Sequence, residues 1–336
     1  MANAHSFPLL RLPNLAREHV VVVMDIREQY LFATLSQKSK RVAKNGLRRL
    51  PHTFRLEMEP DKINIEIQKD GNVRRFEFKI FPADVHGVVS DSRSLNRILF
   101  KVEDIQESSI EQLSFLLGLF NISRFDLHIF RFPTDFIKQV LATVKRLRIT
   151  IFELIVELEN VDNEMYGWTM ENCRDVKRLL NCCPTTHNFQ WDSQEPFCFE
   201  YLSLWSAPWL TLNHMTRLFM NCKFFEVNRN NTQFTIDDLN RFVKLWMNDS
   251  NMEYFEVMVK YSTNLDHILR DIEKEPVRRA FFENRLEEFE PGEAFKIQQE
   301  CGKEAVVCIW GIRFNINTHF NNPKCDFWDI KEDEFP

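Results

Sequence analysis

A run of four valines and a methionine near the start of the chain, Val20 to Met24, limits the possible folds more than any other stretch. In a helix these residues cover more than the ~100° stripe that a one-sided amphipathic helix buries. A buried strand is the alternative, since β-branched residues favour strands. Pro13 suits a first helical turn and Arg27 to Gln29 continue in helix-forming residues, so a helix is favoured. One of its faces is expected to pack on the chain's own helices and the other on another protein.

The segment that holds this run is short. Asn45-Gly46 and Pro51 indicate a break after it, which predicts a first domain over residues 1–50. A unit of roughly 40 residues without disulfides or metal is marginally stable alone. We therefore expect a partner to complete its core.

Three parts of this segment together resemble an F-box: the opening Leu12-Pro13, the apolar helix, and the closing stretch from Leu35 to Arg41. The resemblance implies that the segment is a three-helix domain that binds the Skp adaptor of a Skp-cullin-F-box ubiquitin ligase, and through it a cullin. The adaptor contacts that we predict are Pro8, Leu9, Leu12, Pro13, Leu15, Val20, Val23, Met24, Leu31 and Leu35.

Residues 51–110 are predicted to begin with a small antiparallel β meander. Apolar and polar residues alternate over 54–59, 63–68 and 76–80, and Asp70-Gly71 between the last two runs is a strong hairpin signal. Residues 82–109 are expected to be an irregular connection.

From residue 111 to about 320 short apolar strands are predicted to alternate with helices. The strands are expected near Phe125, Phe152, Phe189, Phe225 and Phe255, which are 27, 37, 36 and 30 residues apart. Helices are expected after Thr134, as a cap, and over Cys173 to Cys183. The spacing is longer and less regular than the 20–29 residues of a leucine-rich repeat.

One internal match supports a repeat: Leu179 to Cys182 resembles Phe219 to Cys222, each expected just before a strand. A degenerate leucine-rich-repeat-like stack is favoured over a non-repeating α/β domain. The fold class is therefore α+β or α/β: a three-helix F-box, a β meander, and a strand-helix domain over 111–320, followed by an acidic tail at 321–336.

The stretch from Leu212 to Val259 resembles the F-box-associated domain (type 2) of the large nematode F-box families, in which this domain follows an F-box. Its central helix is predicted to begin with a capping interaction between Thr235 and Asp238. A stripe of Leu239, Phe242, Val243 and Trp246 is expected to be buried. Trp246 is therefore interpreted as a core residue rather than a ligand-stacking one.

Composition excludes several classes of function. The net charge is −6 and the basic residues are spread along the chain, so no nucleic-acid footprint is present. The basic cluster from Lys38 to Arg49 is interpreted as a solvated helix face rather than a nuclear-import signal. No apolar window is long enough for a membrane span, and no signal peptide is recognised, which predicts a cytoplasmic or nuclear protein. The eight cysteines form no Cys-x-x-Cys pair, so buried thiols are expected rather than a metal site.

No catalytic motif or cofactor-binding loop is found. Cys182-Cys183 with His187 is a weak nucleophile-and-base candidate, because nearness in sequence does not fix geometry. The sequence thus predicts a non-enzymatic adaptor that binds an unknown protein target through its C-terminal domain. The alternative is an interaction scaffold that binds the Skp adaptor but delivers no target.

Overall fold

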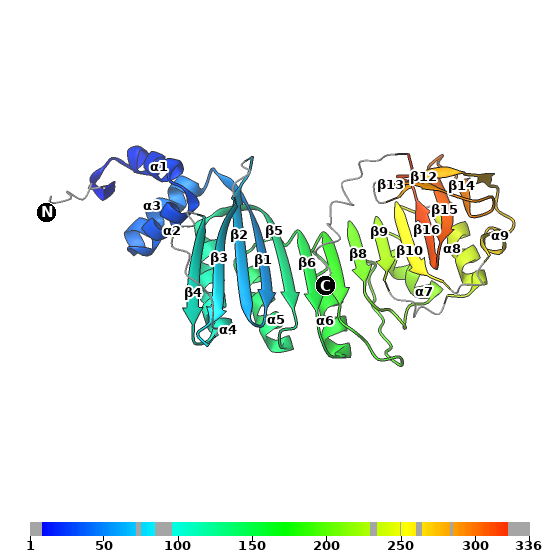
Figure 1. The fold of residues 1–336 in the computed structure, drawn as a ribbon, viewed down its shortest axis with the longest axis horizontal. Helices are drawn as coiled ribbons and strands as arrows, with labels where there is room; N and C mark the ends of the chain where they lie inside the picture. Colours follow the sequence, from blue (N-terminus) through cyan, green and yellow to red (C-terminus); the bar gives the residue numbers. More distant parts are fainter. Residues whose placement is uncertain are drawn as a thin grey trace. The chain divides into compact units, whose positions relative to one another are not determined.

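The structure is a computed structural model that describes residues 9–71, 75–84, 96–228, 234–248, 250–259, 264–282 and 285–321 (Figure 1). The chain forms two compact units, residues 1–154 and 155–336, whose boundary lies within β6 (Glu153–Glu157). The domain boundaries near residues 50, 110 and 320 stay predictions.

Unit 1 begins with a short 3-10 turn and three α-helices: Leu9–Arg11, α1 (Asn14–Val23), α2 (Ile26–Thr34) and α3 (Gln37–Leu47). The valine run is helical, as predicted. Asp25 begins α2 with a capping box: its carboxylate accepts from the Glu28 N–H, and the Glu28 carboxylate accepts from the Asp25 N–H. The predicted break at Asn45-Gly46 is wrong, because both residues lie inside α3.

The sheet of unit 1 has the strand order β5-β1-β2-β3-β4, with β1 (Pro51–Glu59), β2 (Lys62–Lys69), β3 (Arg75–Pro82), β4 (Arg97–Val102) and β5 (Asn121–Phe130). Strands β1, β2 and β3 pair antiparallel, which confirms the meander. Gly71 follows β2 with a φ of 77°, a left-handed conformation that glycine adopts without strain. The segment 82–109 is not wholly irregular, since it contains β4 and the start of α4 (Ile105–Leu119).

Strands β1 and β3 bury every second residue over most of their length, and β2 buries Ile63, Ile65 and Ile67 and also Asn64. Phe54, Ile67 and Phe76 lie side by side in one cross-strand row, and Leu56, Ile65 and Phe78 lie in the next; all six are buried. Helices α4 and α5 (Thr134–Arg146) cover one face of this sheet (Figure 1). Pro133 rather than Thr134 occupies the cap position of α5, so the predicted threonine cap is wrong.

The sheet of unit 2 has the order β11-β14-β15-β16-β10-β9-β8-β7-β6, where the new strands are β7 (Arg178–Cys182), β8 (Tyr201–Leu204), β9 (Phe224–Val227), β10 (Tyr254–Met258), β11 (Glu275–Pro276), β14 (Ala294–Gln298), β15 (Glu304–Trp310) and β16 (Arg313–Asn317). Strands β7 to β10 are parallel and follow chain order. Strand β16 pairs antiparallel with β10, and β15 and β14 continue antiparallel from it. The whole is a mixed α/β fold; the leucine-rich-repeat-like arrangement stays a prediction.

Two of the expected elements in unit 2 are wrong. Residues 189–191 are not a strand, and the helix expected over Cys173 to Cys183 is replaced by α6 (Asn163–Asn172) followed by β7. The two similar four-residue stretches therefore differ in structure: 179–182 lies within β7, whereas 219–222 begins at the last residue of a π-helical turn (Met215–Phe219) and ends before β9. The aligned residues Arg178, Tyr201, Phe224 and Tyr254 are 23, 23 and 30 residues apart. The predicted spacing of 30 between Phe225 and Phe255 is confirmed, since these residues pair in register, whereas the spacings of 37 and 36 are wrong because Phe189 lies outside any strand.

The two faces of this parallel sheet carry different side chains. On one face Phe255 packs against Phe242 of α8 (Ile236–Asn248), with ring centres 4.3 Å apart. The short helices α7 (Leu212–His214) and α9 (Leu265–Ile268) complete the helical part of the unit. The other face carries Tyr201, Phe224 and Tyr254 in one cross-strand row.

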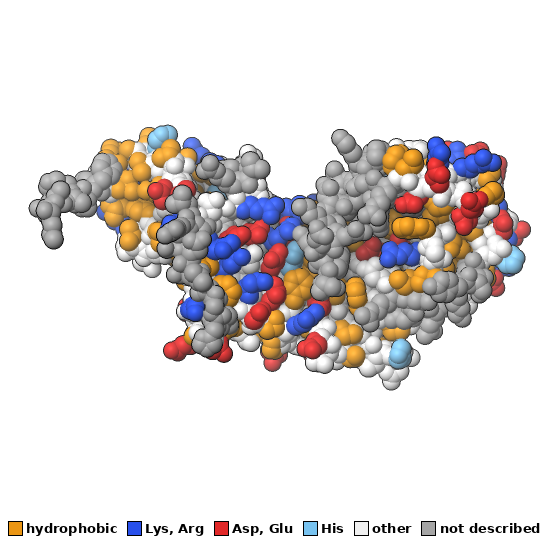
Figure 2. All heavy atoms as spheres, viewed as in Figure 1, with side chains coloured by type: hydrophobic (Ala, Val, Ile, Leu, Met, Phe, Trp, Pro, Cys, Tyr) orange, Lys and Arg blue, Asp and Glu red, His pale blue; other side chains and the backbone are white. Residues whose placement is uncertain are grey.

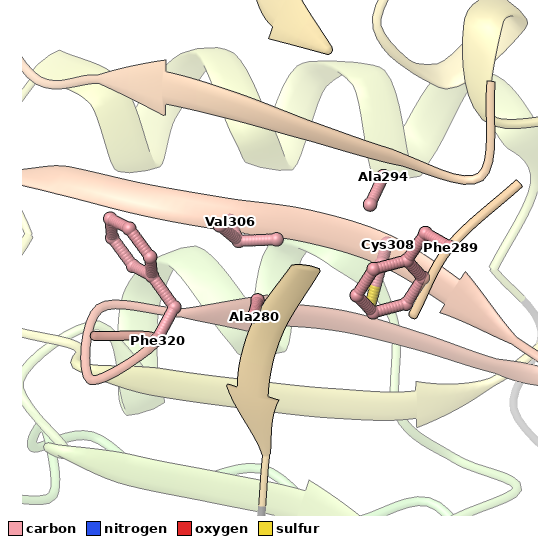
Figure 3. Close-up of a cluster of buried hydrophobic side chains, with 6 residues drawn as sticks. All are labelled: Ala280, Phe289, Ala294, Val306, Cys308 and Phe320. Atoms are coloured by element: carbon pink, nitrogen blue, oxygen red, sulfur yellow. The ribbon is translucent and has the colours of Figure 1, made fainter. Parts of the chain in front are cut away.

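A separate hairpin of β12 (Arg279–Phe282) and β13 (Arg285–Glu288) closes a second small core against β14 and β15. Figure 3 shows its side chains, which are those of Ala280, Phe289, Ala294, Val306, Cys308 and Phe320. The Phe281 N–H donates to the Phe320 carbonyl at 2.8 Å. The hairpin is thereby fixed to the segment that follows β16.

Candidate functional site

Large hydrophobic side chains are exposed on the N-terminal helices. We call Leu15, Val23, Leu31 and Leu35 the N-terminal apolar patch; their exposed fractions are 82%, 69%, 46% and 74%. Figure 2 shows hydrophobic side chains gathered over these helices. Exposed apolar surface of this kind marks sites of protein association.

The other predicted adaptor contacts are also accessible where the structure describes them. Pro13 is exposed, whereas Leu9, Leu12, Val20 and Met24 are partly buried. Pro8 lies outside the described residues. Their contact with an adaptor stays a prediction.

The opposite side of α1 packs within the chain. Val21 is fully buried against α3, where Gly46 leaves room for it. The buried Gln29 side chain donates from Nε2 to the carbonyls of Val21, at 3.0 Å, and Met24, at 2.9 Å. The Val21 carbonyl also accepts from the Met24 N–H, so the Gln29 amide adds a second donor at the end of α1 and links α1 to α2. The valine run thus has one buried and one exposed side, as predicted.

Tyr30 fixes α2 to the rest of unit 1. Its ring lies edge-on to Phe78, with centroids 4.8 Å apart, and to Phe115, with centroids 5.6 Å apart. Its hydroxyl donates to Gln112 Oε1 at 3.1 Å. Burial raises the pKa of Tyr30, so the phenol stays a neutral donor. Neither Gln29 nor Tyr30 was singled out from the sequence, because a buried polar contact leaves no periodic signal.

In unit 2 the predicted capping interaction and buried stripe are both confirmed. The Asp238 N–H donates to Thr235 Oγ1, and the Thr235 N–H donates to Asp238 Oδ2, each at 3.1 Å. Leu239, Phe242 and Trp246 are buried, and Trp246 Nε1 donates to the Met252 carbonyl at 3.0 Å. Trp246 is therefore a core residue.

An aromatic and acidic row on the other face of the unit 2 sheet was not predicted. The Tyr201 hydroxyl donates to Glu226 at 2.6 Å, and the Tyr254 hydroxyl lies 2.5 Å from a Glu256 carboxylate oxygen. The rings of Phe224 and Tyr254 are stacked with centroids 5.6 Å apart. The sequence does hold a signal for it, since Glu226 and Glu256 each follow a phenylalanine and precede a valine in aligned strands.

The structure argues against Cys182 and Cys183 as nucleophiles. Cys182 and Cys183 are buried, and burial raises the pKa of Cys182 to about 12 and that of Cys183 well above its ordinary value. A buried thiol with a raised pKa holds very little thiolate, which is the nucleophilic form. Within the part of the chain that the structure describes, no three metal-ligating side chains gather together. No helix there has the length and apolar character to cross a membrane.

One family model matches the middle of unit 2. Residues 196–257 match the F-box-associated family. The match runs from just before β8 through β9 and α8 to β10, the helix-covered parallel strands described above. Such a domain indicates, in general terms, a target-binding role in an F-box protein.

A similar protein is the Skn-1 dependent zygotic transcript 15 protein of Caenorhabditis elegans. It is 22% identical over 344 residues, which cover 92% of this chain and 96% of that protein. The similarity therefore extends through both units. No solved structure matches the chain significantly.

Proposed function

We propose that this chain is the target-binding subunit of a Skp-cullin-F-box ubiquitin ligase. Residues 9–47 would act as the F-box and bind a Skp-family adaptor, and through it a cullin, while unit 2 would hold a protein target. One observation supports this most: an exposed apolar patch on the N-terminal helices α1 and α2 occurs in the same chain as an F-box-associated match at 196–257.

The energetics of the patch favour a protein partner. Burying a large apolar side chain contributes roughly 1.5–3 kcal/mol, so the four patch residues supply enough free energy to influence binding strongly. Leu15 and Val23 come from α1, and Leu31 and Leu35 from α2 and its C-cap, so one partner would contact both helices. In this role the chain contributes proximity and orientation, and other subunits carry out ubiquitin transfer.

A substitution on the patch tests the adaptor contact. The double variant Leu15→Lys, Leu35→Lys should lose co-purification with the adaptor, because two exposed contacts become charged without disturbing a buried residue. Leu245→Lys is the control, since Leu245 is an exposed leucine on α8 of unit 2. Undiminished adaptor binding by the double variant would exclude residues 9–47 as the adaptor site.

The abundance of the captured proteins distinguishes the proposed function from the scaffold alternative. Quantitative mass spectrometry of the proteins that the chain captures, with and without proteasome inhibition, should reveal a target. The abundance of that target in the cell should then rise when the chain is removed. A stable set of partners whose abundance never depends on the chain would favour the scaffold.

A further inference from the structure

The exposed side of α3 carries several positive charges and no negative charge. We call its four exposed basic residues the basic stripe: Lys38, Arg41, Lys44 and Arg48. At 3.6 residues per turn they lie within an arc of about 120° of the helix. The opposite side of α3 is buried and rests on α1, α2 and α4. The stripe therefore faces away from the helices on which α3 packs.

The charges of the basic stripe are not balanced within the chain. None of its four side chains forms an ion pair or a hydrogen bond with any residue that the structure describes. The sheet of the same unit differs in this respect, since Lys62, Arg75 and Arg97 each pair with a glutamate. The stripe is thus a local excess of positive charge on a chain whose net charge is −6.

The basic stripe does not help α3 to form. Lys44 and Arg48 are four residues apart, a spacing at which like charges on a helix repel each other. Lys38 lies in the first turn, which has no acidic residue and where the helix dipole disfavours positive charge. A bound anion would relieve this repulsion. The charges of the stripe are therefore better explained by binding than by the stability of the helix.

The dimensions and the neighbours of the stripe favour a short acidic polypeptide segment. The stripe extends about 15 Å along the helix axis, which is the length of about five residues of extended chain. The other exposed residues on this side of α3 are Gln37 and Asn45. The described surface of the stripe thus has no aromatic side chain on which a nucleic-acid base can stack, and no apolar side chain that can enter a bilayer.

We propose that the basic stripe binds an acidic segment of the protein target. The contact is additional to the one proposed for unit 2. The N-terminal apolar patch, where the adaptor is expected, lies on α1, α2 and the C-cap of α2, and has no residue on α3. The inference deepens the proposed function, on which it rests for the word target.

The test uses the full chain and the capped, fluorescein-labelled peptide Glu-Asp-Glu-Glu-Asp-Glu. The peptide Gln-Asn-Gln-Gln-Asn-Gln has the same shape without the charge. We expect fluorescence anisotropy to show saturable binding of the acidic peptide and no binding of the neutral one at the same concentration. Added salt should weaken the binding, because it screens exposed charges.

A triple variant removes the stripe. Lys38→Gln, Arg41→Gln, Arg48→Gln should weaken the acidic peptide about tenfold, since each exposed charge contact contributes a factor of roughly two to three.

The matched control is the triple variant Lys62→Gln, Arg75→Gln, Arg97→Gln. It removes three positive charges from the same unit, but these charges are already paired with carboxylates. The control should leave the affinity for the acidic peptide within about twofold of the original.

Several outcomes would overturn the proposal. These are no saturable binding of the acidic peptide, equal affinity for the neutral peptide, or an equal loss of affinity in the two triple variants. Tighter binding of a short RNA with the same number of charges, or of vesicles that contain phosphatidylserine, would assign the stripe to another class of partner if the stripe variant lost that binding.

The adaptor experiment gives a separate result. The stripe variant should still co-purify with the adaptor, and Leu15→Lys, Leu35→Lys should still bind the acidic peptide. Failure of the proposed function would appear as adaptor binding that survives in the patch variant, whatever the peptide does. Loss of the adaptor from the stripe variant would place the stripe in the adaptor contact and would overturn its assignment to a target.

Discussion

Gly46 of α3 lies directly against Val21 of α1: a Cβ added to Gly46 would stand 3.1 Å from the Val21 Cβ. The same added atom would lie 3.1 Å from the Glu18 carbonyl oxygen. A Cβ contact of this length is tighter than about nine in ten that side chains make, so a side chain at residue 46 would require Val21 or the Glu18 backbone to shift by a few tenths of an ångström. The exposed side of α1 is positioned by this contact on its buried side.

Gly46→Val should therefore separate α1 from α3. Valine forms helices better than glycine, so a loss of stability would come from the overpacking, which typically costs 1–3 kcal/mol. We expect faster hydrogen exchange of the α1 amides and weaker capture of the adaptor.

Asn45→Val provides the control, since Asn45 is an exposed neighbour on the same helix. Unchanged exchange in Gly46→Val would show that α1 does not depend on this contact.

The sequence predicted best where one face of an element is buried. Strands β1 and β3 alternate between buried and less buried residues and α8 has a clear 3-4 stripe, so each pattern reports burial directly. Strand β7 is buried on both faces and has no alternation, so its sequence around Leu179-Leu180 predicts a helix equally well. Gly46 predicts a break for a different reason. A glycine that allows two helices to pack closely cannot be told from a glycine in a turn by sequence alone.

The candidate sites also differ in how far the sequence predicts them. The N-terminal apolar patch lies within one short segment, and its excess of apolar residues is visible in the sequence. The aromatic and acidic row of unit 2 joins Tyr201, Glu226 and Tyr254 from different strands. Only the strand register brings such residues together, and the sequence alone did not provide that register.

Trp246→Ala should destabilise unit 2 by about 3–5 kcal/mol, as a large truncation in a packed core. The indole is fully buried, and its N–H bond to the Met252 carbonyl would be lost as well. Urea unfolding followed by circular dichroism measures the change. Leu245→Ala removes an exposed side chain one residue away, and should alter stability by less than about 0.5 kcal/mol. Equal effects of the two variants would contradict the core role of Trp246.

His52 should make the stability of unit 1 depend on pH. The side chain is fully buried next to Phe120, with ring centres 5.0 Å apart, and burial lowers its pKa from 6.5. The unfolded chain therefore binds more protons than the folded one as the pH falls below 6.5, and stability decreases there. We expect the urea midpoint to fall between pH 7 and pH 5, about the range in which histidine titrates.

His52→Gln should reduce that slope, because glutamine does not titrate. His19→Gln changes an exposed histidine of the same unit and should leave the slope as it is. A slope that survives in His52→Gln would assign the pH dependence to other groups.

The last prediction is that residues 1–50 do not fold alone. The fragment keeps the contact of α1 with α3 but loses the surfaces on which α2 and α3 rest. Tyr30 would lose Phe78, Phe100 and Phe115, and the Lys40 ammonium would lose its place 4.2 Å above the Phe115 ring.

A chain of about 50 residues that exposes these side chains in addition to the N-terminal apolar patch lacks the buried area to offset its conformational entropy. We expect the 1–50 fragment to show broad NMR lines and no cooperative thermal transition. A fragment of residues 1–154 includes α4 and the sheet of unit 1, and should melt cooperatively. Co-expression with a Skp-family adaptor should make 1–50 more soluble by covering Leu15 and its neighbours, yet leave the Tyr30 side exposed. Cooperative melting of 1–50 without any partner would show that the contacts of Tyr30 are dispensable for folding.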